Sequence, residues 1–496
     1  MKKRLKHPKL YEINTATWLY ELSRRYGDHV FLGNVPPEEW DRLKALGFHY
    51  IWLMGVWKRS QKGRIYFQTD PQYIPLYDAV LPGWTEDDII GSPYSITSYE
   101  PDPSIGNRQD LDRARHELFK RGMRLILDFV PNHTAPDHPW VIDHPEYYIQ
   151  GDEDDFKNNP TAFSPIHYER DILYIAKGKD PFFPPWPDTA QLNYFNPEMR
   201  SALVEELRKI AKHCDGIRCD MAMLMLNDIF RRNWEWAKNR KSFEAIKTEF
   251  WKEVRHAIPD LVLVAEAYWD TEWELQQLGF DYIYDKRLYD RLRNTSVYDV
   301  NLHLRADIAY QSKLVRFLEN HDEPRSAEVF DRGRLIPSVV LFSTLPGMKL
   351  YYNGQIEGKR IKVPVFLRRV EDEEPDEALR AFYEKLLHIT NQDIFSDGEW
   401  EMKDIISSGD DSFRNLIAYL WKLNGDLQLI IVNLNREVSQ GKIPLQREIA
   451  KDREYVIDDE LNDQRYIRKG SDMIAPGLHI ILEGYHSHIF RVSLKN

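Results

Sequence analysis

The chain of 496 residues has only two cysteines, Cys214 and Cys219. So few cysteines exclude a secreted fold that is stapled by disulfides and favour a reducing compartment. No apolar run reaches the roughly 18 residues of a membrane-spanning helix, and the basic N-terminal stretch is not followed by an apolar segment long enough for a secretory signal. We therefore predict a soluble, cytoplasmic protein without a membrane partner.

The sequence also has no stripe of basic residues. Its 79 acidic residues outnumber its 67 basic ones, which gives a formal net charge of -12. A nucleic-acid partner is therefore excluded, and we expect a neutral or small ligand. With 42% apolar and 13% aromatic residues, the chain can bury a large core.

One pattern repeats from about residue 36 onward: a helix with capping residues, a glycine or polar stop, and a short apolar strand. Eight strands are predicted, at residues 10–15, 48–56, 123–130, 214–222, 261–268, 280–286, 314–322 and 345–354. This alternation predicts an α/β fold, a (β/α)8 TIM barrel. The alternative, an open doubly wound sheet, is disfavoured because no GxGxxG or P-loop lysine motif follows any strand.

Two insertions interrupt this repeat, at residues 58–107 after the second strand and at 134–195 after the third. We predict that residues 1–133 and 196–394 form the barrel and that 134–195 form an insertion domain. After about residue 395 the pattern changes to alternating strands separated by polar turns. Residues 395–496 are therefore predicted to form an antiparallel β-sandwich domain.

Carboxylates stand at the ends of four predicted strands. Asp128, Asp220 and Glu266 share the parity that faces the barrel interior, and Asp322 ends the seventh strand. A single aspartate after a strand is usually a helix cap, but four carboxylates at one end of a barrel repel one another and are costly to keep without a use. Because barrel enzymes build their sites at this end, we expect a catalytic site there.

Paired carboxylates suit glycoside hydrolysis. One carboxylate attacks the anomeric carbon or activates a water molecule, and the other, as a carboxylic acid, protonates the leaving oxygen. Four aromatic residues near the insertion are predicted to be stacking platforms for sugar rings: Trp140, Phe182, Phe183 and Trp186. The competing hypothesis is a metal hydrolase, because His133, His321, Asp128 and Asp322 are of residue types that bind metals. It is disfavoured because no HExxH motif occurs.

Four short segments resemble, in order, the four sequence regions of the alpha-amylase family of glycoside hydrolases: DFVPNH at 128–133, GIRCDMA at 216–222, AEAYWD at 265–270 and FLENHD at 317–322. QLN at 191–193 is similar to an additional region of that family. The resemblance covers residues 9–390 and implies a retaining enzyme acting on α-glucosidic bonds.

The resemblance also implies the catalytic roles. Asp220 corresponds to the nucleophile, Glu266 to the general acid/base, and Asp322 to the carboxylate that binds ring hydroxyls. Glu266 is flanked by Val264, Tyr268 and Trp269, apolar surroundings that favour its protonated form.

Further residues are predicted to bind the substrate. Arg218 is expected to pair with Asp220 and keep it ionised. His133 and His321 are expected to bind the sugar on the nonreducing side of the cleaved bond, and Tyr94 to stack on it. The predicted substrate-binding set is completed by Asp128, Tyr268 and Trp269.

The sequence departs from the family at several positions. Met223 and Leu224 stand where many members have a Lys-His pair that shapes the acceptor side and helps to hold calcium, and Ser95 replaces an aspartate after the stacking tyrosine. We therefore expect a less polar acceptor side and no required cofactor. Asn132 remains the one candidate calcium ligand.

Three functions are compatible with these motifs. The first is a hydrolase of α-1,4-linked glucans or maltooligosaccharides. The alternative is a transglycosylase or isomerase of the same family, such as a 4-α-glucanotransferase or a disaccharide isomerase. A noncatalytic glucan-binding barrel is disfavoured because all three catalytic carboxylates are present.

Overall fold

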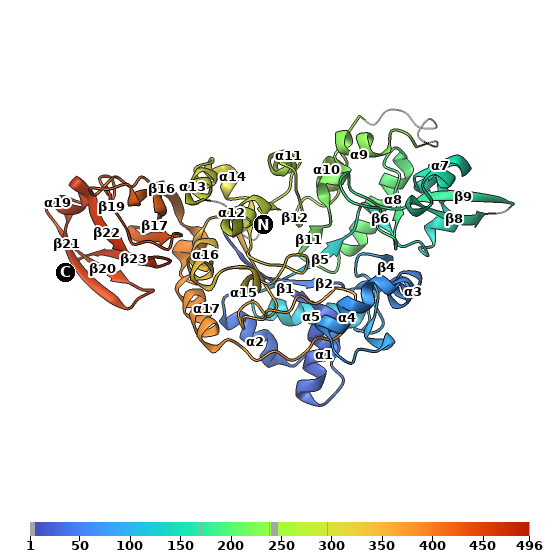
Figure 1. Ribbon diagram of the computed structural model, residues 1–496, viewed down its shortest axis with the longest axis horizontal. Helices are drawn as coiled ribbons and strands as arrows, with labels where there is room; N and C mark the ends of the chain where they lie inside the picture. Colours follow the sequence, from blue (N-terminus) through green and yellow to red (C-terminus); the bar gives the residue numbers. More distant parts are fainter. Residues whose placement is uncertain (1–4, 169, 238, 240–246, 295, 496) are drawn as a thin grey trace.

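A closed barrel of eight parallel strands forms the centre of the molecule (Figure 1). The computed structural model describes residues 5–168, 170–237, 239, 247–294 and 296–495. The hydrogen-bonded order of the barrel is β1 (Lys9–Asn14), β15 (Met348–Tyr352), β14 (Leu314–Arg316), β13 (Tyr282–Tyr284), β12 (Val262–Ala265), β11 (Gly216–Cys219), β5 (Arg124–Phe129) and β2 (Tyr50–Met54). The eight predicted strands and the barrel are confirmed. Residues 1–4, 238, 240–246 and 295 of the predicted barrel, 169 of the predicted insertion and 496 of the predicted sandwich lie outside the described residues.

Helices connect the barrel strands. The principal ones are α1 (Thr15–Tyr26), α2 (Pro37–Ala45), α5 (Arg108–Lys120), α8 (Pro197–Ile210), α10 (Phe250–Ala257), α12 (Lys286–Asn294), α16 (Arg332–Thr344) and α17 (Glu377–Ile389). Helix α8 shows why they form: Asn196 caps its first turn by accepting the backbone N–H groups of Glu198 and Met199. Its apolar residues recur at helical spacing and are buried. Across the described residues, no helix combines the length and apolar character that crossing a bilayer needs.

Both predicted insertions are present, and each adds structure at the same end of the barrel. The segment after β2 contains β3 (Trp57–Arg59), α3 (Gln61–Thr69), α4 (Ile74–Val80) and β4 (Ile96–Pro101). The segment after β5 contains β6 (His133–Thr134), β7 (Gln150–Gly151), β8 (Phe163–Tyr168), β9 (Asp171–Ala176) and β10 (Ala190–Gln191). Strands β7 to β9 form a small sheet that projects from one end of the molecule (Figure 1).

The C-terminal residues form two antiparallel sheets at the opposite end of the molecule (Figure 1). The larger sheet contains β16 (Glu399–Lys403), β17 (Leu416–Leu423), β18 (Asp426–Asn433), β23 (Ser487–Leu494), β20 (Glu454–Asp459) and β21 (Gln464–Lys469), and the smaller one pairs β19 (Ser439–Ile443) with β22 (Leu478–Leu482). An apolar core fills the space between them. The predicted β-sandwich is confirmed.

Two buried lysines lie side by side near the N-terminal ends of β1 and β15. Lys9 and Lys349 are register partners, and the Lys349 ammonium donates to two backbone carbonyls, of His7 at 2.8 Å and Gly347 at 3.1 Å. Burial, together with the charge of Lys9, lowers the pKa of Lys349 well below its usual 10.5. The fold therefore holds this charge at a cost in stability.

Lys349→Met is expected to raise the free energy of unfolding at pH 7 by about 1–3 kcal/mol, because it removes the cost of burying the charge. Since the unfolded chain binds this proton more tightly, the stability of the parent protein rises with pH up to about 10.5, so the advantage of the variant shrinks over that range. Urea unfolding at pH 7 and pH 10 measures both effects. A variant less stable than the parent at pH 7 would contradict this account.

Candidate active site

A single buried arginine organises the carboxylates at the C-terminal end of the barrel. Arg218 Nη1 lies 2.6 Å from Asp220 Oδ1 and 3.6 Å from Asp128 Oδ1, and its Nη2 lies 2.8 Å from Glu266 Oε2. Arg218 ends up here because β11 is paired in register with β5 and β12. One guanidinium thus faces three carboxylates from three neighbouring strands, as strand parity predicts.

Burial and the surrounding charges together set the pKa values of Asp220 and Asp128. Burial raises the pKa of Asp220 to about 8, and the carboxylates of Glu266 and Asp128 add to the effect although Arg218 opposes it. Burial likewise raises the pKa of Asp128 to about 6. The prediction that Arg218 keeps Asp220 ionised is therefore wrong for the free site. At neutral pH the free site therefore favours a proton on Asp220.

The surroundings of Glu266 are polar. Tyr268 Oη donates to Glu266 Oε1 at 2.8 Å, and the Met221 backbone N–H donates to Oε2 at 2.7 Å. Met221 reaches this position with a φ of 44°, and the neighbouring Trp269 has a φ of 60°. Both values are uncommon for residues other than glycine, and such strain is often found at functional sites. The predicted apolar setting of Glu266 is wrong, because strand parity does not reveal which backbone N–H groups turn inward.

His321 joins three elements on the other side of the site. Its Nδ1 donates to Glu12 Oε1 at 2.5 Å, while its Nε2 lies 2.7 Å from Tyr94 Oη and 3.0 Å from Asp322 Oδ2. Although burial opposes the charge, Asp322 and Glu12 raise the pKa of His321 to about 10. The imidazolium in turn holds the pKa of Asp322 well below its usual range, against the effect of burial. Asp322 is therefore an anion at neutral pH.

Glu12 was missed by the sequence analysis. It lies in β1, is fully buried and contacts His321 from 309 positions away in sequence. A charged residue of inward parity in an otherwise apolar strand was the signal that could have found it.

His133 is neutral and fully hydrogen-bonded within the protein. Its Nε2 donates to the Tyr94 carbonyl at 3.1 Å, and burial lowers its pKa to about 4. Asp128 accepts hydrogen bonds from Trp52 Nε1 at 3.1 Å and from the Gly55 N–H at 3.3 Å. These hydrogen bonds fix the orientation of the His133 and Asp128 side chains.

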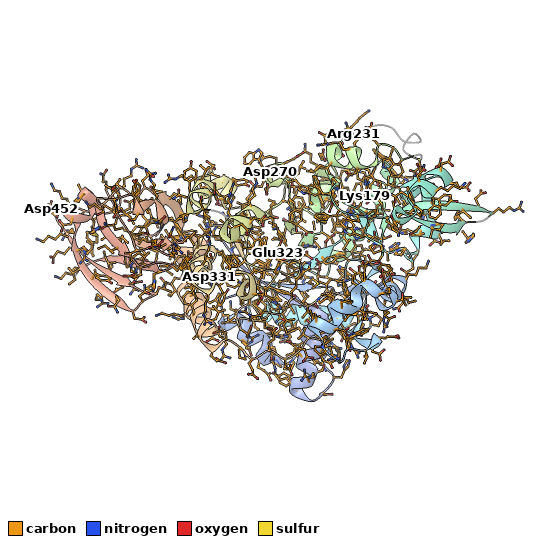
Figure 2. All side chains as sticks on the ribbon, viewed as in Figure 1. Lys179, Arg231, Asp270, Glu323, Asp331 and Asp452 are labelled. Carbon is orange, nitrogen blue, oxygen red and sulfur yellow. The ribbon has the colours of Figure 1, made fainter. Side chains whose placement is uncertain are left out.

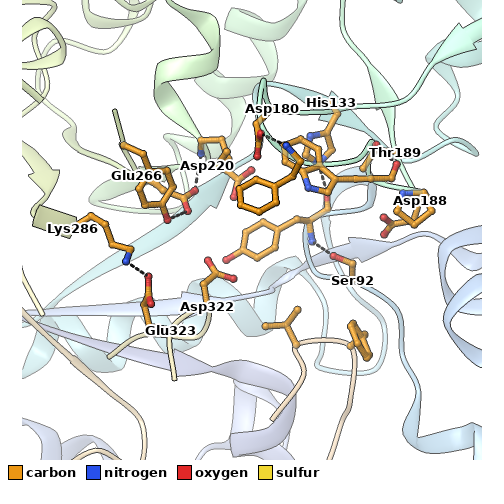
Figure 3. A pocket seen from close by; sticks show the side chains of 18 of the residues that line it. Ser92, His133, Asp180, Asp188, Thr189, Asp220, Glu266, Lys286, Asp322 and Glu323 are labelled. Carbon is orange, nitrogen blue, oxygen red and sulfur yellow. Dashed lines mark hydrogen bonds and ion pairs between the residues drawn. The ribbon is translucent and has the colours of Figure 1, made fainter. Parts of the chain in front are cut away.

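A cavity of about 820 Å³ lies beside these groups, within the size range of small-ligand sites. Of the ten predicted catalytic and substrate-binding residues, those that line it are Tyr94, His133, Asp220, Glu266, Tyr268, Trp269 and Asp322. The other three, Asp128, Arg218 and His321, lie behind that lining. Figure 3 shows Asp220 between Glu266 and Ser92, with Asp322 facing the same space.

Several lining residues were not predicted. Lys286, Arg287, Asp290 and Glu323 line one end of the cavity, and Lys286 Nζ lies 3.2 Å from Glu323 Oε1 (Figure 3). Figure 2 places Glu323 in the middle of the molecule, between Asp452 of the C-terminal sheets and Lys179 of the insertion. Lys286, Arg287 and Asp290 belong to α12 and Glu323 to the loop after β14, so strand parity gives no information on them.

The predicted aromatic platforms are only partly at the site. Phe183 and Trp186 line the cavity. Phe182 is 69% exposed and meets the edge of Trp269, whereas Trp140 packs against Tyr147 inside the insertion. Trp140 is therefore part of the local core of the insertion.

The residues that replace the family's Lys-His pair do not reach the substrate space. Met223 and Leu224 are at most 1% exposed and belong to the main core. Met221, two positions earlier, lines the cavity in their place. The prediction that these two side chains form a less polar acceptor side is therefore wrong, because the turn after β11 directs them away from it.

The surroundings of Asn132 do not fit a calcium ion. Its side-chain oxygen accepts from Gln191 Nε2 at 3.2 Å, and its amide nitrogen donates to Gln191 Oε1 at 3.2 Å. Calcium binds to several free oxygen ligands, with carboxylates prominent among them. This amide pair leaves no such oxygen. Within the described ranges, no three His, Cys, Asp or Glu side chains are placed to hold a metal ion.

Comparison with known proteins shows the family to which the chain is similar. The family model for the alpha amylase catalytic domain matches residues 37–395. The chain is 27% identical over 317 residues to Alpha-amylase 3 of Dictyoglomus thermophilum, a match that covers 58% of this chain and 56% of that protein. It is 24% identical over 289 residues to the trehalose synthase/amylase TreS of Mycobacterium tuberculosis, covering 51% and 46%. The chain thus spans about half the length of these curated relatives.

The fold also has close counterparts among solved structures. The maltogenic alpha-amylase AmyB from Thermotoga neapolitana superposes with a TM-score of 0.69 over 99% of both chains, at 20% sequence identity. At this identity the similarity establishes the shared fold.

Proposed function

The chain belongs to the alpha-amylase family of glycoside hydrolases, and from this membership we propose that it is a retaining enzyme that cleaves α-1,4-glucosidic bonds in maltooligosaccharides or glucans. The observation that carries the proposal is the pair formed by Asp220 and Glu266 on the two ends of the Arg218 guanidinium. Both carboxylates face the same cavity. Such a pair is what glycoside hydrolysis requires.

In the proposed mechanism, Asp220 attacks the anomeric carbon while Glu266 gives its proton to the glycosidic oxygen. The bond to the leaving sugar breaks, and a covalent ester between the sugar and Asp220 forms with inverted configuration. Glu266 then removes a proton from water, which attacks the ester and frees the sugar with its original α configuration. The anionic Asp322 accepts hydroxyl groups of the same ring and stabilises the positive charge of the transition state.

In the proposed mechanism Asp220 attacks as the anion, so it first has to lose the proton that burial and the neighbouring carboxylates favour on it in the free site. Arg218 contacts both catalytic carboxylates, so it stabilises the negative charge as this moves from Asp220 to Glu266 in the first half-reaction and back to Asp220 in the second.

The function is tested by incubating the purified protein with maltoheptaose and separating the products over time. Shorter sugars alone, first released as α anomers, are the expected result. Products longer than the substrate would identify transfer to sugar instead of water. Absence of any product, also with maltose, trehalose and sucrose, would leave only a binding role and contradict the proposal.

Transfer is the second candidate because the leaving-group side carries polar charged groups. Lys286, Arg287 and Asp290 line the cavity there and offer hydrogen bonds that hold a second sugar in place of water. The similarity to a trehalose synthase/amylase is consistent with this candidate.

We also propose that the enzyme works without calcium. Because the Asn132 amide is paired with Gln191, we expect that an excess of EDTA leaves both the activity and the melting temperature unchanged. Thermal unfolding and maltoheptaose hydrolysis, each with and without EDTA and with added calcium, check this expectation. A fall in either quantity that calcium restores would contradict it.

A further inference from the structure

Glu12 is a buried carboxylate that lies behind the active site and does not line the cavity. It belongs to β1, where its register partners are Trp52 of β2 and Tyr352 of β15, and its exposed fraction is 0%. Its Oε1 contacts the ring of His321, and that ring lies next to Asp322. Any effect of Glu12 on a bound ligand must therefore pass through His321.

The His321 ring has a carboxylate at each of its two nitrogens. Nδ1 lies 2.5 Å from Glu12 Oε1, and Nε2 lies 3.0 Å from Asp322 Oδ2. A neutral imidazole has a single N–H, so a ring that donates to both carboxylates must be the imidazolium. The buried ring meets Trp52 edge to face at 5.5 Å and stacks on Tyr94 at 5.4 Å. This packing fixes the direction of both N–H groups.

The charge of Glu12 is balanced at one point only. Its second oxygen, Oε2, has no hydrogen-bond partner in the described part of the chain, and across the same residues His321 is the only cation within ion-pair distance. A buried carboxylate is costly, and an uncharged side chain of similar size would fill this place at lower cost. Packing alone therefore does not explain a carboxylate at this position.

His321 in turn holds the carboxylate of Asp322. Among the described residues it is the one ion-pair partner of that carboxylate. The Asp322 side chain is 47% exposed and faces the cavity, so few protein contacts restrain it (Figure 3). A hydrogen bond from an imidazolium is about twice as strong as one from a neutral ring. The orientation of Asp322 therefore depends on the charge of His321.

The two carboxylates keep His321 charged against opposing effects. Burial lowers the pKa of the ring, but Asp322 and Glu12 raise it, to about 10. The other titratable or charged groups that act on the ring or on Asp322 come from four further elements: Tyr94, Asp128, Arg218 and Lys362. Of these, the cations Arg218 and Lys362 disfavour a charge on the ring. Glu12 is therefore needed to offset them.

We propose that Glu12 is a positioning residue that keeps His321 charged and thereby orients the Asp322 carboxylate toward the sugar. The inference rests on the proposed function, since it assigns Glu12 to the step in which Asp322 stabilises the transition state. Without Glu12 the ring loses its proton at a lower pH, and Asp322 then loses the charged donor that holds it.

Glu12→Gln tests this role by kinetics, because glutamine fills the same space and can still accept from Nδ1 but lacks the charge. We expect the ratio of variant to parent kcat/KM on maltoheptaose to stay within roughly threefold of unity at pH 6 and to fall by roughly 10- to 100-fold by pH 9, as the ring loses its proton. A ratio that does not change with pH would show that Glu12 contributes packing only, and would overturn the inference. Glu38→Gln is the matched control. Glu38 is exposed at the start of α2, and its variant should match the parent at every pH.

The charge of His321 is measured directly by NMR of protein with ¹⁵N-labelled histidine rings. Its signal, among those of 16 histidines, is the one that His321→Gln removes. Both ring nitrogens should carry a proton in the parent at pH 8, and the titration midpoint should be at least roughly one pH unit lower in Glu12→Gln. Equal midpoints, or a neutral ring in the parent at pH 8, would overturn the inference alone. A parent that cleaves none of the sugars would overturn the proposed function and the role of Glu12 in it, whatever the titration shows.

Discussion

Asp220→Asn is expected to lower kcat on maltooligosaccharides by roughly 10⁴- to 10⁶-fold, the range found when a covalent nucleophile is removed. Asparagine has nearly the same shape as aspartate but cannot form the ester with the anomeric carbon. Because Asp220 lies in a crowded cluster of buried carboxylates that raises its pKa, its replacement by the uncharged asparagine should leave the melting temperature unchanged or higher. Single-turnover kinetics and thermal unfolding of the purified variant measure the two effects.

A second variant of the same residue gives a stereochemical test. In Asp220→Ala, azide is expected to occupy the vacated space and attack the anomeric carbon from the face that the carboxylate used, which yields a β-glycosyl azide. An α-glycosyl azide would show that Asp220 is not the nucleophile. Asp228→Asn is a matched control, because Asp228 is 78% exposed and lies eight positions after Asp220. It should retain full activity.

Glu266→Gln is expected to lower kcat by roughly 10²- to 10⁴-fold, which is the contribution of general acid/base catalysis. The loss should depend on the leaving group. A glucosyl fluoride needs little protonation of the departing atom, so its first step should be much less affected than that of maltoheptaose. Steady-state kinetics on both substrates measure the difference.

Two outcomes would contradict the acid/base assignment of Glu266: full activity of Glu266→Gln, or an equal loss on both substrates. Glu274→Gln is the control. Glu274 is exposed and lies in α11 (Glu272–Gln277), only eight positions after Glu266. It is expected to retain the parent rate on each substrate. Tyr268 and the Met221 N–H still have one oxygen to bind in the glutamine variant, so its fold should persist.

The central part of this site was predictable from local sequence. A strand must alternate its side chains, so inward parity placed Asp128, Arg218 and Glu266 in one interior as soon as the barrel was inferred. The barrel itself followed from the repeated helix-to-strand transitions. These features depend only on neighbours in the sequence.

The features that were missed depend on contacts between distant segments. Nothing near Tyr73 in sequence indicates that its ring packs against Phe366 in the lining of the cavity. The prediction that Asp220 is ionised in the free site was wrong for the same reason. Arg218 alone would keep it ionised, but burial opposes the charge more strongly, and Glu266 and Asp128 from other strands add to the effect of burial. Charge in a buried cluster is set by the sum of its members.

The contact between Glu12 and His321 links completion of the site to closure of the barrel. The two residues are separated by 309 positions, and β1 closes the barrel only when it pairs with β15. A ribosome makes Glu12 first and must add nearly the whole barrel before His321 emerges. During synthesis, this side of the site therefore stays incomplete until the last strands of the barrel have been made.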